Sequence, residues 1–190
     1  MARWKDIRFG LVCAAGVMAL FGLQQLFPLC KLMMLRNTDS VALKALHSFT
    51  CIFVHGNLLH AAVNATAFLC LLFTVKFSDG RAPFFSGLAA GWAATFLFAL
   101  FIMPQHTTLV GSSGMIFGLL GWFTATEPFS RWSIYFIGSI PLIVLAPAVV
   151  LLDSMTAIFF FKLNAWQIHL TAFAIGSGIG CIKWREQVSA

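Results

Sequence analysis

One stretch decides the fold of this chain: residues 104–128, with the sequence PQHTTLVGSSGMIFGLLGWFTATEP. Its apolar part, from Ser113 to Glu127, is 15 residues long. A helix of that length is about 22 Å long, too short for the ~30 Å hydrocarbon core of a bilayer. The preceding loop, 104–112, carries no charged side chain, so we expect it to dip into the protein and to start the helix below the outer membrane surface. Non-helical backbone at that depth needs protein or a water-filled cavity around it, which predicts an outward-opening polar cavity at Ser112 and Ser113.

The rest of the chain predicts a membrane protein with a single domain, residues 1–190. Of its 190 residues, 60% are hydrophobic and 9% are charged, against about 25% charged in soluble domains. Long apolar runs in lipid must be helices, because every backbone polar group has to be satisfied internally. We therefore predict an all-α polytopic fold with six transmembrane spans, joined by short loops, in a lipid bilayer. The six spans are 10–29, 51–75, 83–103, 113–127, 131–152 and 165–183.

Basic residues predict the orientation. The formal charge of +6 is scattered between the spans and forms no patch, so no nucleic acid is expected as a partner. With the N-terminus inside, the cytoplasmic segments carry eight Lys and Arg and the outer loops carry four. The positive-inside rule then places both termini in the cytoplasm, in an inner or plasma membrane. The cytoplasmic set is Arg3, Lys5, Arg8, Lys76, Arg81, Arg131, Lys183 and Arg185, and the outer set is Lys31, Arg36, Lys44 and Lys162.

Cysteine usage predicts neither disulfides nor a metal. The five cysteines show no CxxC spacing, and most lie inside apolar runs, where Cys behaves as a small hydrophobe. No HExxH motif occurs, and His55 and His60 are five residues apart with no acidic residue near them. We expect no metal and no cofactor. The basic N-terminus before the first apolar run lacks a convincing cleavage site, so we expect an uncleaved first helix.

Polar residues inside the spans are functional candidates, because they are costly in lipid. Spans two, four and six run from outside to inside, so three polar groups share the outer half of the membrane. Small residues recur at helical spacing after Ser113 and after His169, which lets the two helices approach closely and bring nucleophile and base together. The groups are His55, Asn57, His60 and Asn64 on the second span, with the last three on one face; Gly111 to Gly114 at the start of the fourth; and His169 near the start of the sixth.

Plainer explanations exist for each of these features. A Ser at a helix start is usually an N-cap, which is the interpretation we prefer for Ser112. A lone His in a membrane helix can serve packing or proton relay, and stripes of small residues mostly serve packing. The GxSxG elbow of soluble hydrolases is absent. All three polar groups are expected at a similar depth in the membrane. This coincidence is the observation that chance explains least well.

Three motifs together resemble the rhomboid family. Residues 49–64, FTCIFVHGNLLHAAVN, resemble the second-helix pattern of the family with its HxxxxHxxxN core. Residues 111–114, GSSG, match its GxSG motif and continue as MIFGLLG, and His169 with the small residues after it resembles its sixth-helix motif. The resemblance covers about residues 41–184 in the expected order.

This resemblance implies a rhomboid-type six-helix transmembrane bundle with a short buried fourth helix. It also implies an intramembrane serine endopeptidase that cleaves transmembrane protein substrates near the outer membrane boundary. Ser113 would be the nucleophile and His169 the general base. Asn64 and His60 would help to bind the oxyanion, and Phe117 would pack beside the histidine ring. The family uses a dyad without an acid, in agreement with the lack of an evident acidic partner for His169 in the sequence.

The sequence departs from the family pattern at two places. Leu43-Lys44 stands where many members have Trp-Arg, and Ala172 replaces a common Gly three residues after His169. The alternative function is a non-catalytic rhomboid-like protein that binds membrane helices. A small transporter or channel component is a further rival, although it would favour charged residues inside the spans. The sequence does not specify the substrate or the oligomeric state.

Overall fold

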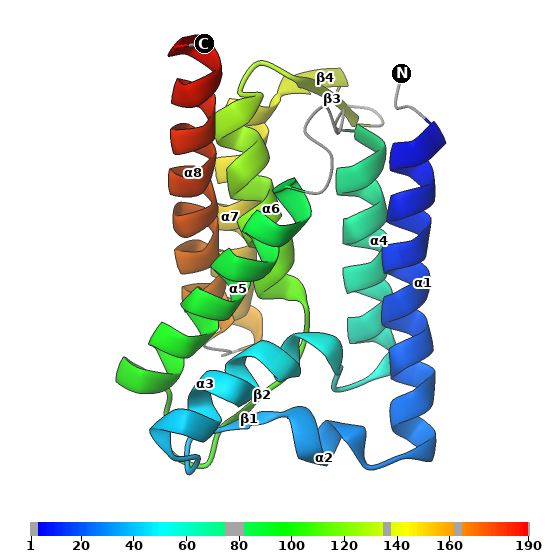
Figure 1. Cartoon of the computed structure of the whole chain (residues 1–190), viewed down its shortest axis with the longest axis vertical. Helices are drawn as coiled ribbons and strands as arrows, with labels where there is room; N and C mark the ends of the chain where they lie inside the picture. Colours follow the sequence, from blue (N-terminus) through cyan, green and yellow to red (C-terminus); the bar gives the residue numbers. More distant parts are fainter. Residues whose placement is uncertain (1–3, 75–81, 135–137, 162–164, 190) are drawn as a thin grey trace.

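The structure is a computed structural model that describes residues 4–74, 82–134, 138–161 and 165–189. It is mostly helical, as the composition predicts (Figure 1). Two short strand pairs, β1 with β2 and β3 with β4, are both antiparallel. In chain order the elements are α1 (Trp4–Leu26), α2 (Leu29–Met33), β1 (Leu35–Arg36), α3 (Val41–Thr50), the 3₁₀ turn η1 (Cys51–Phe53), α4 (Leu58–Thr74), α5 (Ala82–Phe101), β2 (Thr108–Leu109), α6 (Ser113–Thr126), β3 (Arg131–Ile134), β4 (Gly138–Pro141), α7 (Leu142–Thr156), the π-helical η2 (Ala157–Phe161) and α8 (Ala165–Ser189).

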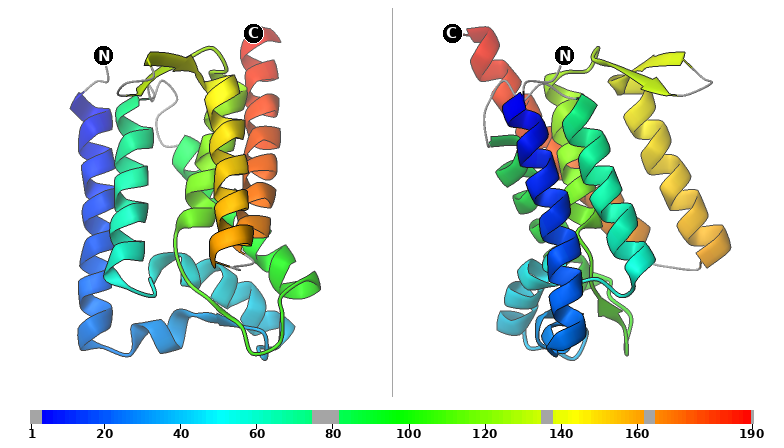
Figure 2. Two further views of the ribbon diagram at one scale, coloured as in Figure 1. Left: turned by 180° about the vertical axis from the view of Figure 1, so that it is seen from behind. Right: turned by 90° about the vertical axis from the view of Figure 1, so that its right-hand side faces the viewer.

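Two groups of helices stand side by side. α1 pairs with α4, and α6 packs between α5 and α8, with α7 on the outside (Figures 1 and 2). Elements α2, α3, β1 and β2 cover one end of the molecule, and the β3–β4 hairpin covers the other. The start of α1 and the end of α8 lie at the hairpin end. Ser113, the first residue of α6, is therefore located toward the end formed by α3.

Several helices are suited to a membrane. Three of them are long and apolar enough to cross one: residues 82–101, 142–159 and 165–186. A fourth span results if the bent pair formed by 41–53 and 58–71 counts as one, and α6 and residues 11–26 of α1 are shorter apolar helices. Large apolar side chains remain exposed on the outside, among them Val12 at 68% and Leu152 at 65%. Together these features indicate an integral membrane protein with several spans.

The second predicted span begins later than expected. Residues 51–53 form η1, and α4 starts only at Leu58 after a bend of 80°. Gly56 and Asn57 account for the break, because both residue types favour turns over helix interiors. The backbone N–H of His60 donates to Asn57 Oδ1 at 2.8 Å, as at a helix N-terminus. The expectation that His55 and Asn57 lie on this helix is wrong, whereas His60 and Asn64 do lie on α4.

The fifth predicted span, 131–152, is also shifted. Its first part is the β3–β4 hairpin, in which Arg131 pairs with Pro141 and Ile134 with Gly138. Pro141, at ψ 142°, ends the strand and directly precedes α7. The helix then continues to Thr156 and into η2, so that Asp153 lies on α7 and not in a loop. Residues 76–81 of the loop expected between the second and third spans, 76–82, lie outside the described residues.

Glycines let α6 touch its two neighbours backbone to backbone. A Cβ added at Gly176 of α8 would collide with the Gly118 carbonyl, lying 2.8 Å from its carbon and 3.0 Å from its Cα. A Cβ added at Gly118 would lie 2.8 Å from Ala90 Cβ and 2.9 Å from the Gly87 oxygen, both on α5. The expected close approach of α6 and α8 is present. We expected Gly118 to face α8 near Ala172 and Gly176, and its backbone does meet Gly176. A Cβ added at Gly118 would nevertheless point at α5, so this glycine serves both contacts.

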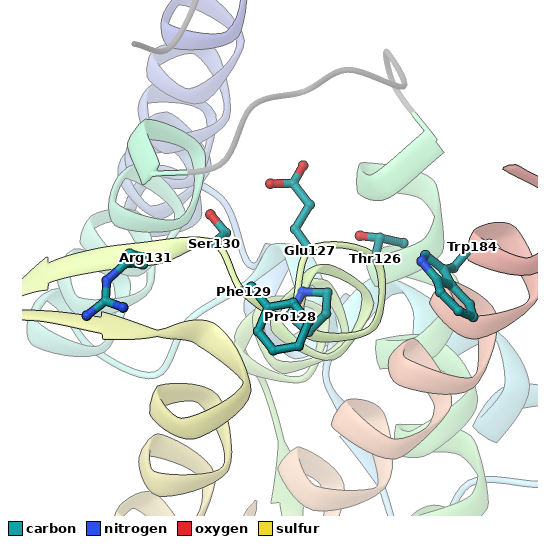
Figure 3. Close-up of a pocket in the computed structure, with 7 residues that line it drawn as sticks. All are labelled: Thr126, Glu127, Pro128, Phe129, Ser130, Arg131 and Trp184. Carbon is teal, nitrogen blue, oxygen red and sulfur yellow. The ribbon is translucent and has the colours of Figure 1, made fainter. Parts of the chain in front are cut away.

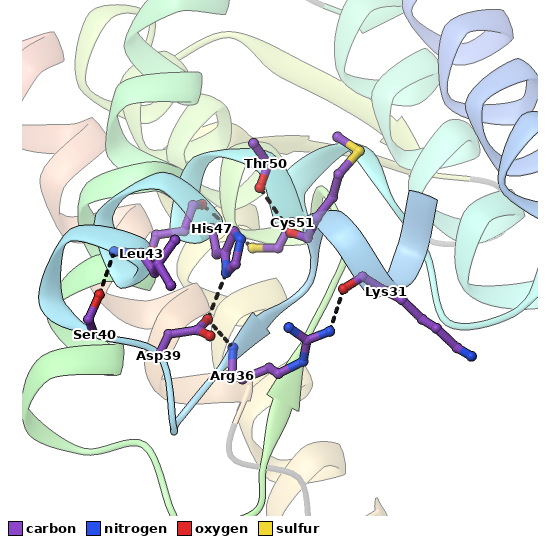
Figure 4. A network of polar contacts seen from close by, with 10 residues as sticks. Lys31, Arg36, Asp39, Ser40, Leu43, His47, Thr50 and Cys51 are labelled. Atoms are coloured by element: carbon purple, nitrogen blue, oxygen red, sulfur yellow. Dashed lines mark hydrogen bonds and ion pairs between the residues drawn. The ribbon is translucent and has the colours of Figure 1, made fainter. Parts of the chain in front are cut away.

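The segment between α1 and α4 is tied down by polar contacts (Figure 4). Asp39 Oδ2 lies 2.7 Å from His47 Nδ1 and accepts the Arg36 backbone N–H at 2.9 Å. Partial burial would raise the pKa of the Asp39 carboxyl, but the hydrogen bonds and positive charges of His47 and Arg36 outweigh it and hold that pKa below its ordinary value. Lys44 donates to the Ala99 carbonyl at 3.0 Å, near the C-terminal end of α5 where a cation is favoured. This Lys, one of the two departures from the family pattern, thus anchors α3 to α5.

Candidate active site

The chain positions Ser113 through a constrained turn. Gly111 has φ +118°, a conformation that side chains rarely adopt, and its N–H donates to the Cys51 carbonyl at 2.8 Å. Ser112 occupies the N-cap position of α6, but its side chain makes no capping bond. Its Oγ lies instead 3.3 Å from Nε2 of His55. Ser112 is thus the N-cap residue, as expected, but its hydroxyl does not cap the helix. Ser113 then begins the helix, half-buried.

Ser113 and His169 are in direct contact. The Ser113 Oγ lies 2.8 Å from His169 Nε2, across the glycine-lined contact of α6 with α8. The ring of Phe117, one turn below Ser113, stacks on the His169 ring with centroids 4.5 Å apart and an interplanar angle of 11°. His169 itself is 8% exposed. A hydroxyl and an imidazole nitrogen at this distance have the geometry of a nucleophile with its base.

An acidic side chain contacts His169 on the side opposite Ser113. The sequence leads us to expect that His169 has no acidic partner. Asp153 Oδ2 lies 2.7 Å from His169 Nδ1, the other ring nitrogen. The expectation failed because it placed Asp153 in a loop, whereas this residue lies on the last turns of α7. One signal was present: Asp153 is the only charged residue in the apolar stretch 142–161.

Asn64 and His60 flank the turn that precedes Ser113. A Cβ built on Gly111 would lie 2.7 Å from His60 Nε2 and 3.6 Å from Asn64 Nδ2, so only glycine fits between them. Asn64 is 4% exposed, and its Nδ2 has no hydrogen-bond partner within the described part of the chain. A buried donor without a partner is costly, which makes this amide a candidate for binding a ligand. An oxygen atom near Gly111 is the ligand that this amide could bind.

His55 packs against His60 and is itself held by Gln24 of α1. Gln24 was not identified from the sequence. The His55 backbone N–H donates to Gln24 Oε1 at 3.0 Å, and the Gln24 amide donates back to the His55 carbonyl. The fully buried His55 ring lies edge-on to His60, with centroids 5.2 Å apart. A polar Gln24 inside the apolar first span was the available signal. No three potential metal ligands among His, Cys, Asp and Glu gather anywhere in the described residues.

A cavity of about 650 Å³ lies at the other end of α6 (Figure 3). Since α6 runs for 14 residues, about 21 Å at the rise of a helix, this cavity is remote from Ser113. It takes no part in the contacts of Ser113 and His169. It is lined by Thr126, Glu127, Pro128, Phe129, Ser130, Arg131 and Trp184.

Comparison with known proteins agrees with the motifs. No curated protein matches this chain. A family model described as the Rhomboid domain matches residues 43–186, which is most of the chain and contains Asn64, Ser113 and His169. The match begins in α3 and ends near the end of α8, and so contains α4, α6, α7 and α8, which carry Asn64, Ser113, Asp153 and His169. On this match, the chain belongs to the rhomboid family.

Proposed function

We propose that this protein is an intramembrane serine endopeptidase that cleaves transmembrane protein substrates near the outer membrane boundary. The contact of Ser113 Oγ with His169 Nε2, at 2.8 Å in a chain of this family, is the observation that carries the proposal. The remaining site residues support it by their positions around the same serine.

The reaction follows from these positions. His169 Nε2 takes the proton of Ser113 as Oγ attacks the scissile carbonyl, and a tetrahedral oxyanion forms. The oxyanion accepts hydrogen bonds from Asn64 Nδ2, from His60 and from the Ser113 backbone N–H, one of the unpaired donors at the start of α6. His169 then gives its proton to the leaving amine. Water hydrolyses the acyl-enzyme, with His169 again acting as the base.

The membrane topology that we propose has six crossings: α1, α4, α5, α6, α7 and α8. This places the α3 end outside, since the cytoplasmic side should carry the larger number of Lys and Arg. The substrate carbonyl must then be reached from the outer half of the membrane. A helix hides its carbonyls, so the substrate must unwind there, and helix-weakening residues in the substrate would favour cleavage.

The test combines labelling with cleavage. A fluorophosphonate should label the purified protein in detergent, and both labelling and cleavage of a transmembrane substrate panel should disappear in Ser113→Ala and His169→Ala. Ser112→Ala is the matched control: it removes the neighbouring hydroxyl and should keep most of both activities. A protein that neither labels nor cleaves would favour the non-catalytic, helix-binding alternative. Labelling that survives Ser113→Ala would instead assign the nucleophile to another residue.

A further inference from the structure

His169 has two ring nitrogens, and the structure gives each of them a partner. Nε2 meets the Ser113 hydroxyl at 2.8 Å, and Nδ1 meets the Asp153 carboxylate at 2.7 Å. The three groups come from three different helices: α6, α8 and α7. The ring face is covered by Phe117, so the two in-plane hydrogen bonds fix how the imidazole is turned.

With the Asp153 carboxylate ionised and the His169 ring neutral, hydrogen-bond chemistry allows one assignment of the protons. An ionised carboxylate can only accept, so the Nδ1–H of a neutral imidazole must donate to Asp153. A neutral imidazole carries one proton, which leaves Nε2 with its lone pair facing Ser113. That is the tautomer in which His169 can receive a proton from the hydroxyl. When the ring becomes an imidazolium, the adjacent carboxylate also stabilises its positive charge.

We infer that Asp153 is a positioning residue that orients His169, giving this chain an Asp–His–Ser row instead of a simple dyad. The inference rests on the proposed function, since it assigns a role in the same reaction. Asp153 is the only charged residue in the apolar segment 142–161. A carboxylate in a membrane helix is costly, so its presence suggests a functional role. The Asp153 side chain is 31% exposed, that of His169 only 10%. The ring is therefore more shielded than the carboxylate that contacts it.

The size of the effect follows from this exposure. In a buried triad of a soluble protease, replacing the Asp with Asn lowers kcat by about 10⁴-fold, because the wrong tautomer is favoured. Asp153 is only partly buried, so its contact with the ring should be weaker than that of a fully buried carboxylate. We therefore expect Asp153→Asn to lower kcat by about 10- to 100-fold, equivalent to about 1.4–2.7 kcal/mol.

The chain supplies a matched control. Asp39 meets His47 Nδ1 at the same 2.7 Å distance, but in the segment between α1 and α4, away from Ser113. Both variants remove one carboxylate–imidazole contact. Asp153→Asn should lower kcat and the rate of fluorophosphonate labelling while KM and the thermal midpoint stay near wild type. Asp39→Asn should leave kcat and the labelling rate unchanged, and Asp153→Glu should restore part of the rate that Asp153→Asn loses.

An NMR measurement tests the hydrogen bond without relying on turnover. With ¹⁵N-labelled histidine, a ring N–H proton bonded to a carboxylate resonates far downfield. The His169 signal should be lost in Asp153→Asn and in His169→Ala, while that of His47 with Asp39 should be lost only in Asp39→Asn. Wild-type labelling that depends on Ser113, together with an unchanged labelling rate in Asp153→Asn, overturns this inference and leaves the proposed function standing. A loss of thermal midpoint without a loss of kcat overturns it as well. A wild-type protein that does not label overturns both proposals.

Discussion

Two glycines on α8 test whether backbone contact sets the geometry of the site. Gly176 lies two helical turns below His169, and its Cα faces the backbone of Gly118. Gly178, two residues further on, has nothing within 4 Å of its missing Cβ. The substitutions Gly176→Ala and Gly178→Ala add the same methyl group to the same helix. Only the first should change the protein.

The structure gives the size of the disturbance at Gly176. A Cβ there would lie 2.8 Å from the Gly118 carbonyl carbon, and ordinary contact begins at 3.4 Å. The two backbones must therefore separate by at least 3.4 − 2.8 = 0.6 Å, and by more for the carbonyl oxygen. Overpacking of this kind typically costs about 1–3 kcal/mol. A shift approaching ~1 Å between base and nucleophile can cost about 100-fold in rate.

The assay is cleavage of one transmembrane substrate in detergent, with the thermal midpoint measured on the same preparations. Gly176→Ala should lower kcat by about 10- to 100-fold and the midpoint by about 3–9 °C, at about 3 °C per kcal/mol for a chain of this size. Gly178→Ala should keep both, or gain slightly in stability, since Ala is the better helix former. Wild-type kcat and midpoint in Gly176→Ala would show that the α6–α8 contact does not set the Ser113–His169 distance.

Three further outcomes are expected. Asn64→Ala should reduce kcat by about 100-fold with KM nearly unchanged, because a single oxyanion donor acts mainly in the transition state; steady-state kinetics giving a wild-type kcat would remove Asn64 from this role. Because its folded-state pKa is lowered, Asp39 should stabilise the protein fully above its unfolded pKa of about 3.9 and lose that contribution as pH falls through the folded value. Thermal midpoints across that acid range should therefore fall more steeply for wild type than for Asp39→Asn, and equal slopes would contradict the pairing with His47. Cleavage should persist in EDTA, and a loss that zinc restores would argue for a metal mechanism.

The sequence predicts the parts of this site that depend on local pattern. The short run 113–127 predicts α6 to within a residue. The polar motif before it and Glu127-Pro128 after it fix where the helix can begin and end. The small residues after Ser113 and His169 predict the close approach of α6 and α8. Periodicity does not show that Gly118 contacts both neighbours, with its backbone against Gly176 of α8 and its missing Cβ toward α5. A helix surrounded by protein has no polar side that would fix its rotation.

What the sequence could not predict depends on tertiary structure. Residues 131–141 continue an apolar segment into α7, so hydropathy alone merges the hairpin with the helix. Asn57 fits the period of α4, but Gly56 and the capping bond of Asn57 make the helix begin only after it. Asp153 is 16 residues from His169 in the chain. Only the path of α7 brings the two together, and no spacing rule encodes that path.

The backbone contact of Gly118 with Gly176 has a consequence for how the protein responds to its lipids. Membrane helices meet a thicker or thinner bilayer chiefly by changing their tilt. α6 and α8 cannot tilt against each other without overlap of their backbones, because no layer of side chains lies between them there. α7 reaches the core through side chains such as Leu142 and Val150, which can change rotamer and let the helix move. A change in lipid chain length should therefore alter the distance from Asp153 to His169 before it alters the distance from His169 to Ser113.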